Sequence, residues 1–252
     1  MRLFAHQLAG EQRLYYRSRE LAFFTFHFPI ILLLLLGSVY GDETIKKEHN
    51  VKASSYLVAG ILGYGVAATA FAGLAIVLVL RRESGVLKRV RGTPLPPATY
   101  LEAVIASTTI VYLIEAAALI ALGRLAYDVP LPRQWPSLIL AILLGALAFA
   151  ALGIALSGVV RSGDGASAVV NAIYLPVAFL AGSFWSAQNF PGPIRDISNV
   201  LPLTHFIRLM RNILVLHQEI WDNWEQVAVV ADWGLAGLVL AVLFFRWEPR
   251  EG

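Results

Sequence analysis

The most highly charged part of the sequence is the segment 81–92, which reads RRESGVLKRVRG. If this segment is helical, Val86, Leu87 and Val90 form one apolar stripe and the Lys and Arg side chains surround it. Prolines follow at once in the sequence GTPLPP, and they predict a firm end to the helix because proline lacks a backbone donor. The pattern has two interpretations: a basic loop retained in the cytoplasm, or a short helix that docks into a cytoplasmic partner.

A second group of candidate residues combines acids and bases within apolar surroundings. Glu102 and Glu115 occupy an otherwise apolar segment at about 98–123, and Arg208 and Arg211 occur in a later one. A charge at the middle of a bilayer costs roughly 2.5–3.5 kcal/mol on insertion scales, so such residues normally face protein or water. We expect Glu115 to lie at a depth similar to that of the two arginines. The hypothesis is an ion pair that holds an extracellular gate shut; the alternative is a buried pair with a purely structural role.

Several other kinds of chemistry are not supported by the sequence. There is no cysteine, which excludes disulfides, thiolate nucleophiles and cysteine-based metal sites. The histidines lack ligand spacing, so we expect no metal site. No serine lies in a G-x-S-x-G context, and no G-x-x-x-x-G-K-[ST] motif is present to bind a nucleotide. We therefore expect a chain that is not an enzyme and binds no cofactor of its own.

The composition indicates which elements position these residues. Hydrophobic residues make up 58% of the chain, charged residues only 15%, and the mean hydropathy is +0.66. Three stretches without any charge, 56–80, 136–160 and 166–185, are each long enough to cross a bilayer as a helix. They do not alternate every second residue as barrel strands do. The sequence therefore predicts an all-α integral membrane protein.

Six transmembrane helices are expected, at about 21–40, 56–80, 98–123, 137–160, 166–185 and 226–246. Residues 1–20 combine arginines with spaced apolar side chains and predict an amphipathic helix at the membrane interface, followed by a first span that is retained rather than cleaved. The segment 186–225 contains an apolar helical stretch too short to cross, so we expect it to be re-entrant or interfacial. Glycines and alanines in the second and fourth spans predict close helix packing.

The distribution of basic residues predicts the orientation. Of the 20 Lys and Arg residues, 12 fall on the side that holds both termini and the segment 81–92. Because basic loops stay in the cytoplasm, both termini are expected to be cytoplasmic. The charge thus indicates topology and a lipid environment, not nucleic-acid binding.

The segment from Arg82 to Pro94 resembles the coupling helix of type-2 ABC transporter permeases, in which an R-E-x-G-x-L-x-x-L-x-x-T-P pattern ends the second span. The family includes daunorubicin-resistance-type drug exporters and polysaccharide and lipid exporters. Residues 175–184 resemble its fifth span, and 190–211 resemble its extracellular re-entrant pair with an N-P-L-T-Y…R signature. This chain departs from the signature at Leu201 and Arg208, which puts any transferred substrate in doubt. The resemblance implies ATPase coupling through Arg82, Glu83, Gly85, Val86, Leu87, Val90, Thr93 and Pro94.

The resemblance also implies the organisation and the function. Residues 1–252 would form a single ABC permease domain, with the interfacial helix at 1–20, the coupling helix at 81–92 and the re-entrant region at 186–225. Two permeases, identical or closely related, would work with two cytoplasmic ATPase subunits that bind ATP and Mg²⁺. The expected function is export of an amphipathic drug, lipid or lipid-linked glycan across the cell membrane. Two alternatives remain: an ion-coupled secondary transporter that uses Glu102 or Glu115, and a membrane-embedded lipid-modifying transferase.

Overall fold

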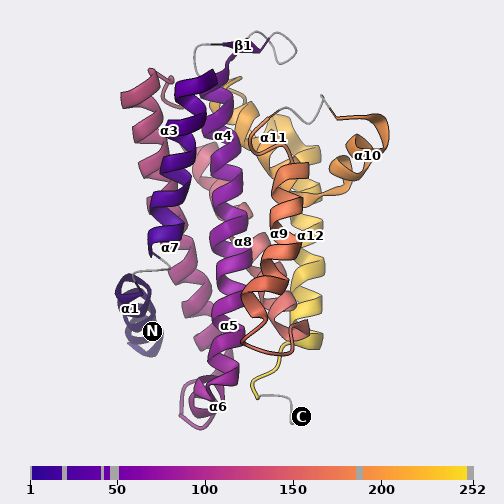
Figure 1. Ribbon diagram of the computed structural model, residues 1–252. Coiled ribbons are helices and arrows are strands. Elements are labelled where there is room, and N and C mark those ends of the chain that lie inside the picture. The colour runs from indigo at the N-terminus through magenta and orange to yellow at the C-terminus, as the bar shows by residue number, and fades with distance from the viewer. Residues whose placement is uncertain (1, 19–21, 41–42, 46–50, 186–189, 249–252) are drawn as a thin grey trace.

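A computed structural model of the chain describes residues 2–18, 22–40, 43–45, 51–185 and 190–248. Nearly all of these residues are helical (Figure 1). The one sheet among the described residues is an antiparallel pair of two-residue strands, β1 (Thr44–Ile45) and β2 (Val51–Lys52). The helices are α1 (Arg2–Arg17), η1 (Phe23–His27), α3 (Phe28–Tyr40), α4 (Ala53–Val66), η2 (Ala67–Gly73), α5 (Leu74–Glu83), α6 (Val86–Arg91), α7 (Pro97–Tyr127), α8 (Trp135–Val159), α9 (Ala166–Leu180), α10 (Gly192–Val200), α11 (Pro202–Leu214), η4 (Ile220–Asn223) and α12 (Trp224–Phe244).

Among the described residues, four helices are long and apolar enough to cross a membrane. They are Ala53–Glu83, which joins α4, η2 and α5 into one rod, then α7, α8 and Ile220–Phe244. Two shorter apolar helices cover Thr25–Tyr40 and α9. Each of the six predicted spans thus coincides with an apolar helix, which supports the all-α membrane class. The number of crossings stays a prediction.

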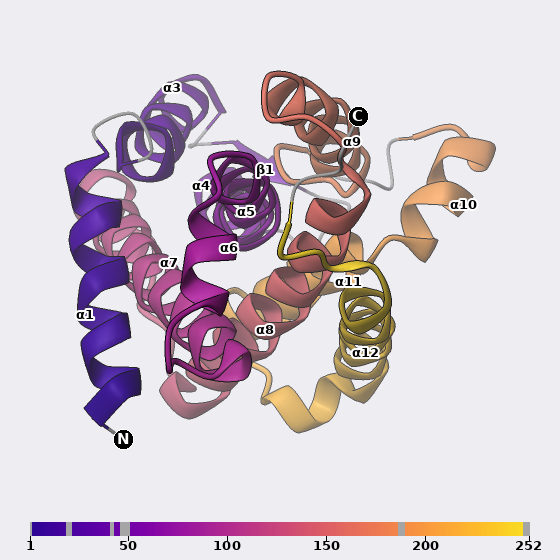
Figure 2. The ribbon, with the colours of Figure 1, turned by 90° about the horizontal axis from the view of Figure 1, so that it is seen from below.

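Helix α8 is the centre of the bundle. It packs against α12, α5, η2, α7 and α11, and the view from the α6 end shows neighbours on several sides of it (Figure 2). Gly153 of α8 faces the backbone of η2, where an added Cβ would lie 2.7 Å from the carbonyl oxygen of Phe71. The close helix packing predicted for the second and fourth spans occurs here between the two spans themselves, because only a glycine allows the two backbones to approach this closely.

The segment predicted as one coupling helix at 81–92 is divided in the structure. Residues 81–83 are the last turn of α5, and α6 spans only Val86–Arg91. Gly85 lies between them with φ 71°, in the left-handed region that glycine enters at little cost. Gly85 thus separates the rod Ala53–Glu83 from α6 and lets α6 take another direction. The helix predicted at 81–92 therefore begins five residues too early.

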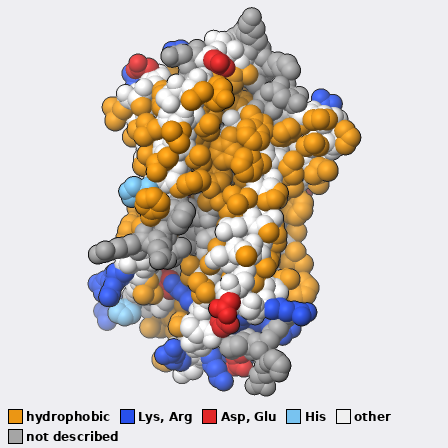
Figure 3. Space-filling model, in the orientation of Figure 1, with side chains coloured by type: hydrophobic (Ala, Val, Ile, Leu, Met, Phe, Trp, Pro, Cys, Tyr) orange, Lys and Arg blue, Asp and Glu red, His pale blue; other side chains and the backbone are white. Residues whose placement is uncertain are grey.

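The two ends of the bundle differ in their side chains. Helices α1 and α6 and the end of α12 lie at one end, and β1, α10 and α11 lie toward the other (Figure 1). Lys and Arg side chains gather at the α6 end, and an apolar band covers the middle of the visible face (Figure 3).

The predicted N-terminal helix corresponds to α1, which packs against α7, and its place at the membrane interface stays a prediction. The predicted re-entrant region corresponds to α10, α11 and η4, with residues 186–189 outside the described ranges. Helix α11 buries 10 of its 13 residues against α4, α12 and α8, so it packs inside the bundle instead of lying on its surface.

Candidate coupling site and buried polar network

Helix α6 presents a basic surface away from the bundle. Lys88, Arg89 and Arg91 are exposed. Arg91 forms an ion pair with Glu248 at 3.7 Å, but both side chains are more than half exposed and such pairs contribute little. The helix is short, and just beyond its end the Thr93 hydroxyl donates to the carbonyl of Val90 at 2.7 Å. The result is a small cationic projection at the basic end of the molecule.

Two residues of the apolar stripe predicted for this segment, Leu87 and Val90, face the chain's own core. Leu87 is 0% exposed and belongs to a core cluster with Leu78, Tyr100 and Ile154. Val90 packs against the same cluster and is partly buried. Leu87 therefore anchors α6 to the bundle, while Pro94 and the cations face outward.

The residues just before α6 contact other parts of the bundle, although Glu83 is exposed. Arg82 is only 4% exposed, and its two terminal nitrogens donate to the carbonyls of Ser157 at 2.6 Å and Val160 at 2.5 Å. Glu83 accepts a hydrogen bond from the backbone N–H of Gly163. These two residues of the sequence motif thus contact the end of α8 and the loop before α9.

Arg81 connects the same turn to two other helices. Its guanidinium forms a two-point ion pair with Glu11 of α1, at 2.7 and 3.0 Å, and donates to the hydroxyl of Tyr100 of α7 at 2.8 Å. Glu11 is buried and is also bonded by Gln7 at 2.8 Å. Sequence reasoning missed Glu11; the available signal was an acid in the middle of an otherwise basic amphipathic segment.

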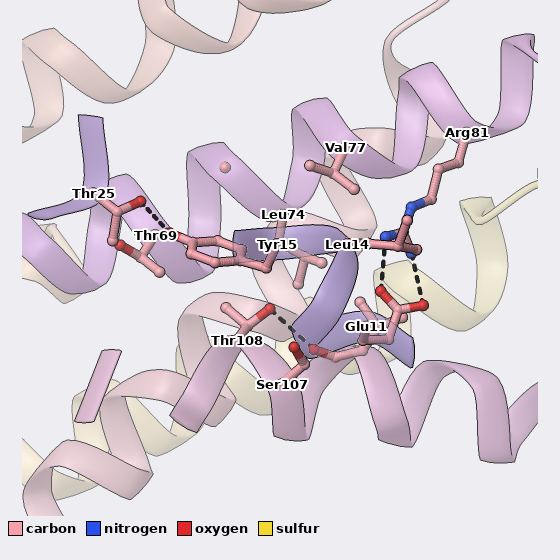
Figure 4. A pocket seen from close by; sticks show the side chains of 12 residues that line it. Glu11, Leu14, Tyr15, Thr25, Thr69, Leu74, Val77, Arg81, Ser107 and Thr108 are labelled. Carbon is pink, nitrogen blue, oxygen red and sulfur yellow. Dashed lines mark hydrogen bonds and ion pairs between the residues drawn. The ribbon is translucent and has the colours of Figure 1, made fainter. Parts of the chain in front are cut away.

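A pocket of about 90 Å³ lies between α1, the rod Ala53–Glu83 and α7 (Figure 4). The ion pair of Glu11 and Arg81 lies at one end of the pocket, and hydroxyl groups line the other end. There Tyr15 donates to Thr25 at 2.5 Å. Burial raises the pKa of the Tyr15 hydroxyl above its ordinary value, so the group stays protonated and remains a donor. Helix α1 is therefore fixed to the bundle by polar contacts.

Glu115 is buried, with 1% of its surface exposed. One carboxylate oxygen accepts a hydrogen bond from Thr69 of η2 at 2.9 Å, and the other lies against Gly65, where an added Cβ would collide with it. Gly65 and Thr69, on neighbouring turns of the second span, thus leave space for the Glu115 carboxyl group. Glu102, by contrast, is exposed.

The structure does not bring Glu115 together with the two arginines. Arg208 donates to the side-chain oxygen of Asn199 at 2.5 Å. Arg211 donates to the carbonyl of Gly182 at 2.6 Å, and its guanidinium lies 3.4 Å from the ring centre of Tyr56. The arginines connect α11 to neighbouring segments at the end of the bundle opposite α6, and the expected contact with Glu115 is absent. Their role in a gate stays a prediction.

Comparisons with known proteins agree with this architecture. A family model described as ABC-2 type transporter matches residues 3–215. YvfS of Bacillus subtilis, whose name describes a transport permease, is 26% identical over 207 residues, covering 82% of this chain and 83% of YvfS. The inner membrane transport permease YhhJ of Escherichia coli is 27% identical over 170 residues, covering 67% of this chain and 46% of YhhJ.

A more distant relative is ABC transporter G family member 20 of Dictyostelium discoideum, which is 24% identical over 143 residues, or 55% of this chain and 19% of that protein. The family match extends from α1 to the end of α11 and includes the coupling segment and the buried network. The multi-pass helical bundle and this match together show that the chain belongs to the ABC-2 type transporter family.

Proposed function

We propose that this chain is the transmembrane permease subunit of an ATP-driven ABC exporter. Membership of the ABC-2 family implies association with an ABC ATPase. In the proposal, two copies of a separate ATPase bind ATP and Mg²⁺ and serve two copies of the permease. The six apolar helices cross the cell membrane, α10 and α11 form the re-entrant pair on the outer side, and both termini are cytoplasmic. The cargo is an amphipathic drug, lipid or lipid-linked glycan.

The observation that carries the proposal is the basic projection of α6. It stands at the end of the bundle where Lys and Arg side chains gather, which is the end that the positive-inside rule assigns to the cytoplasm (Figure 3). Because Leu87 is buried in the chain's own core, the exposed contacts available to an ATPase are mainly Lys88, Arg89 and Arg91. Complementarity then predicts an acidic surface on the partner.

Reversing these three charges should release the ATPase. The variant Lys88→Glu, Arg89→Glu, Arg91→Glu places negative charges opposite the proposed acidic surface, so most of the co-expressed ATPase should fail to co-purify with the permease. The same pull-down in wild type should weaken as salt rises, since exposed charges are screened.

A matched control reverses three exposed arginines at the opposite end: Arg124, Arg133 and Arg195. It changes the net charge equally and should leave co-purification intact. Full ATPase recovery with the α6 variant would contradict the proposed docking surface, and equal loss with both triple variants would indicate a non-specific effect of net charge.

The ion-coupled alternative makes a different prediction. It needs acids that exchange ions with water, and Glu102 is exposed while Glu115 is enclosed between Thr69 and Gly65. Family membership favours the ATP-driven function. Transport by proteoliposomes that contain the permease and no ATPase would support the alternative and contradict the proposed exporter.

A further inference from the structure

The last turn of α5 contains three consecutive charged residues that contact different parts of the bundle. We propose that this charged triplet, Arg81, Arg82 and Glu83, transmits the displacement of α6 to the end of α8 and the start of α9, and also to α1 and α7. The inference rests on the proposed function, because it assumes that an ATPase moves α6. It assigns the triplet a positioning role inside the permease, in place of the contact with the ATPase that the sequence motif suggested for Arg82 and Glu83.

Arg82 holds the end of α8. The last carbonyls of a helix have no partner within the helix and carry the negative end of its dipole. Arg82 supplies both the hydrogen bonds and the positive charge there, through Ser157 at 2.6 Å and Val160 at 2.5 Å. Bonds from a charged donor are shorter and stronger than neutral ones. The end of α5 and the end of α8 therefore move together.

Glu83 holds the start of α9. Its carboxylate accepts the backbone N–H of Gly163, and it lies so close to Gly163 that an added Cβ there would displace it. The carbonyl of Gly163 in turn accepts the N–H of Ala166, the first residue of α9, at 3.0 Å. Only two hydrogen bonds separate Glu83 from the backbone of α9.

Arg81 makes the contacts on the other side of the rod, with Glu11 of α1 and Tyr100 of α7. The ion pair is mostly withdrawn from water, with side-chain exposures of 18% and 5%, so it is screened less than a surface pair. Only Ser84 and Gly85 separate the triplet from α6. A shift of α6 is thus passed to elements that are distant in sequence.

The test uses the absence of cysteine in the chain, which allows single reporter cysteines. One reporter is Ser84→Cys next to α6, and the other is Val169→Cys on α9, where the side chain is exposed. Maleimide labelling rates are measured in the permease–ATPase complex without nucleotide and with ATP trapped. In the wild-type background we expect both reporters to change rate on ATP trapping.

Glu83→Ala removes the acceptor for Gly163 and should abolish the ATP-dependent change at Val169→Cys, while the change at Ser84→Cys and ATPase co-purification persist. Glu83→Gln retains an acceptor oxygen and should restore the response. Asp164→Ala removes an exposed carboxylate one residue from Gly163 and serves as the matched control, with the wild-type response at both reporters.

An ATP-dependent change at Val169→Cys that survives Glu83→Ala would overturn the proposed transmission through Glu83. So would a wild-type complex in which only Ser84→Cys responds. A permease that binds no ATPase, with both reporters silent, would instead refute the proposed function and the inference with it.

Discussion

Replacing Leu87 by aspartate should destabilise the permease itself, even when no ATPase is present. Leu87 is 0% exposed within a cluster that includes Leu78 and Tyr100. Removing a buried leucine side chain typically costs about 2–5 kcal/mol, the range expected for Leu87→Ala. Leu87→Asp should cost more, because it adds an unpaired carboxylate to an apolar site.

The measurement is denaturant-induced unfolding of the purified permease in detergent. Arg89→Asp is the control, because Arg89 is an exposed position two residues along the same helix and should leave the free energy of unfolding nearly unchanged. If Leu87→Asp kept wild-type stability and lost only the ATPase, Leu87 would belong to the docking surface after all.

The second large effect is expected at Gly153. A Cβ there would lie 2.7 Å from the carbonyl oxygen of Phe71 and 2.9 Å from that of Ala70, both backbone atoms of η2. Backbone cannot rotate away as a flexible side chain can, so Gly153→Val should separate α8 from the second span. Overpacking of a well-filled core costs about 1–3 kcal/mol, and we expect at least the upper end of that range.

The same unfolding assay checks this prediction against Gly10→Ala. Nothing lies within 4 Å of an added Cβ at Gly10, which is inside helix α1. Alanine has the higher helix propensity there, so the control should stabilise the protein by up to about 1 kcal/mol. Equal stabilities of Gly153→Val and wild type would mean that the two helices are not in backbone contact.

The apolar helices were predictable from the sequence because the cost of exposing backbone polar groups to lipid leaves few alternatives for uncharged runs near twenty residues. The packing of these helices against one another could not be predicted as well from the sequence. The Arg-Glu pair before Gly85 indicated where α6 begins. The contacts of Arg82 and Glu83 could not be predicted, because they depend on where α8 ends and α9 begins. Those segments lie some 75 to 80 residues later in the chain.

The prediction for Glu115 shows a related limit. Counting residues along a helix estimates depth in the bilayer, and it contains no information about which neighbour lies beside a residue at that depth. The structure gives Glu115 a hydroxyl partner, Thr69, from the second span, and gives Arg211 the carbonyl of Gly182 and the ring of Tyr56. Lateral neighbours of this kind depend on tertiary packing.

The π-helical segment η2, Ala67–Gly73, affects where the chain can tolerate the deletion of a residue. A π-helical turn accommodates extra chain compared with an α-helical one, and such turns often occur at functional sites. Deleting one codon within it could restore a uniform α-helix and leave the residues beyond facing nearly as before, whereas deleting one codon of α5 before Arg81 would rotate everything beyond by about 100°. Arg81 would then turn away from Glu11, and Arg82 from the carbonyls of Ser157 and Val160. A one-residue deletion should therefore be better tolerated in η2 than in α5 before Arg81.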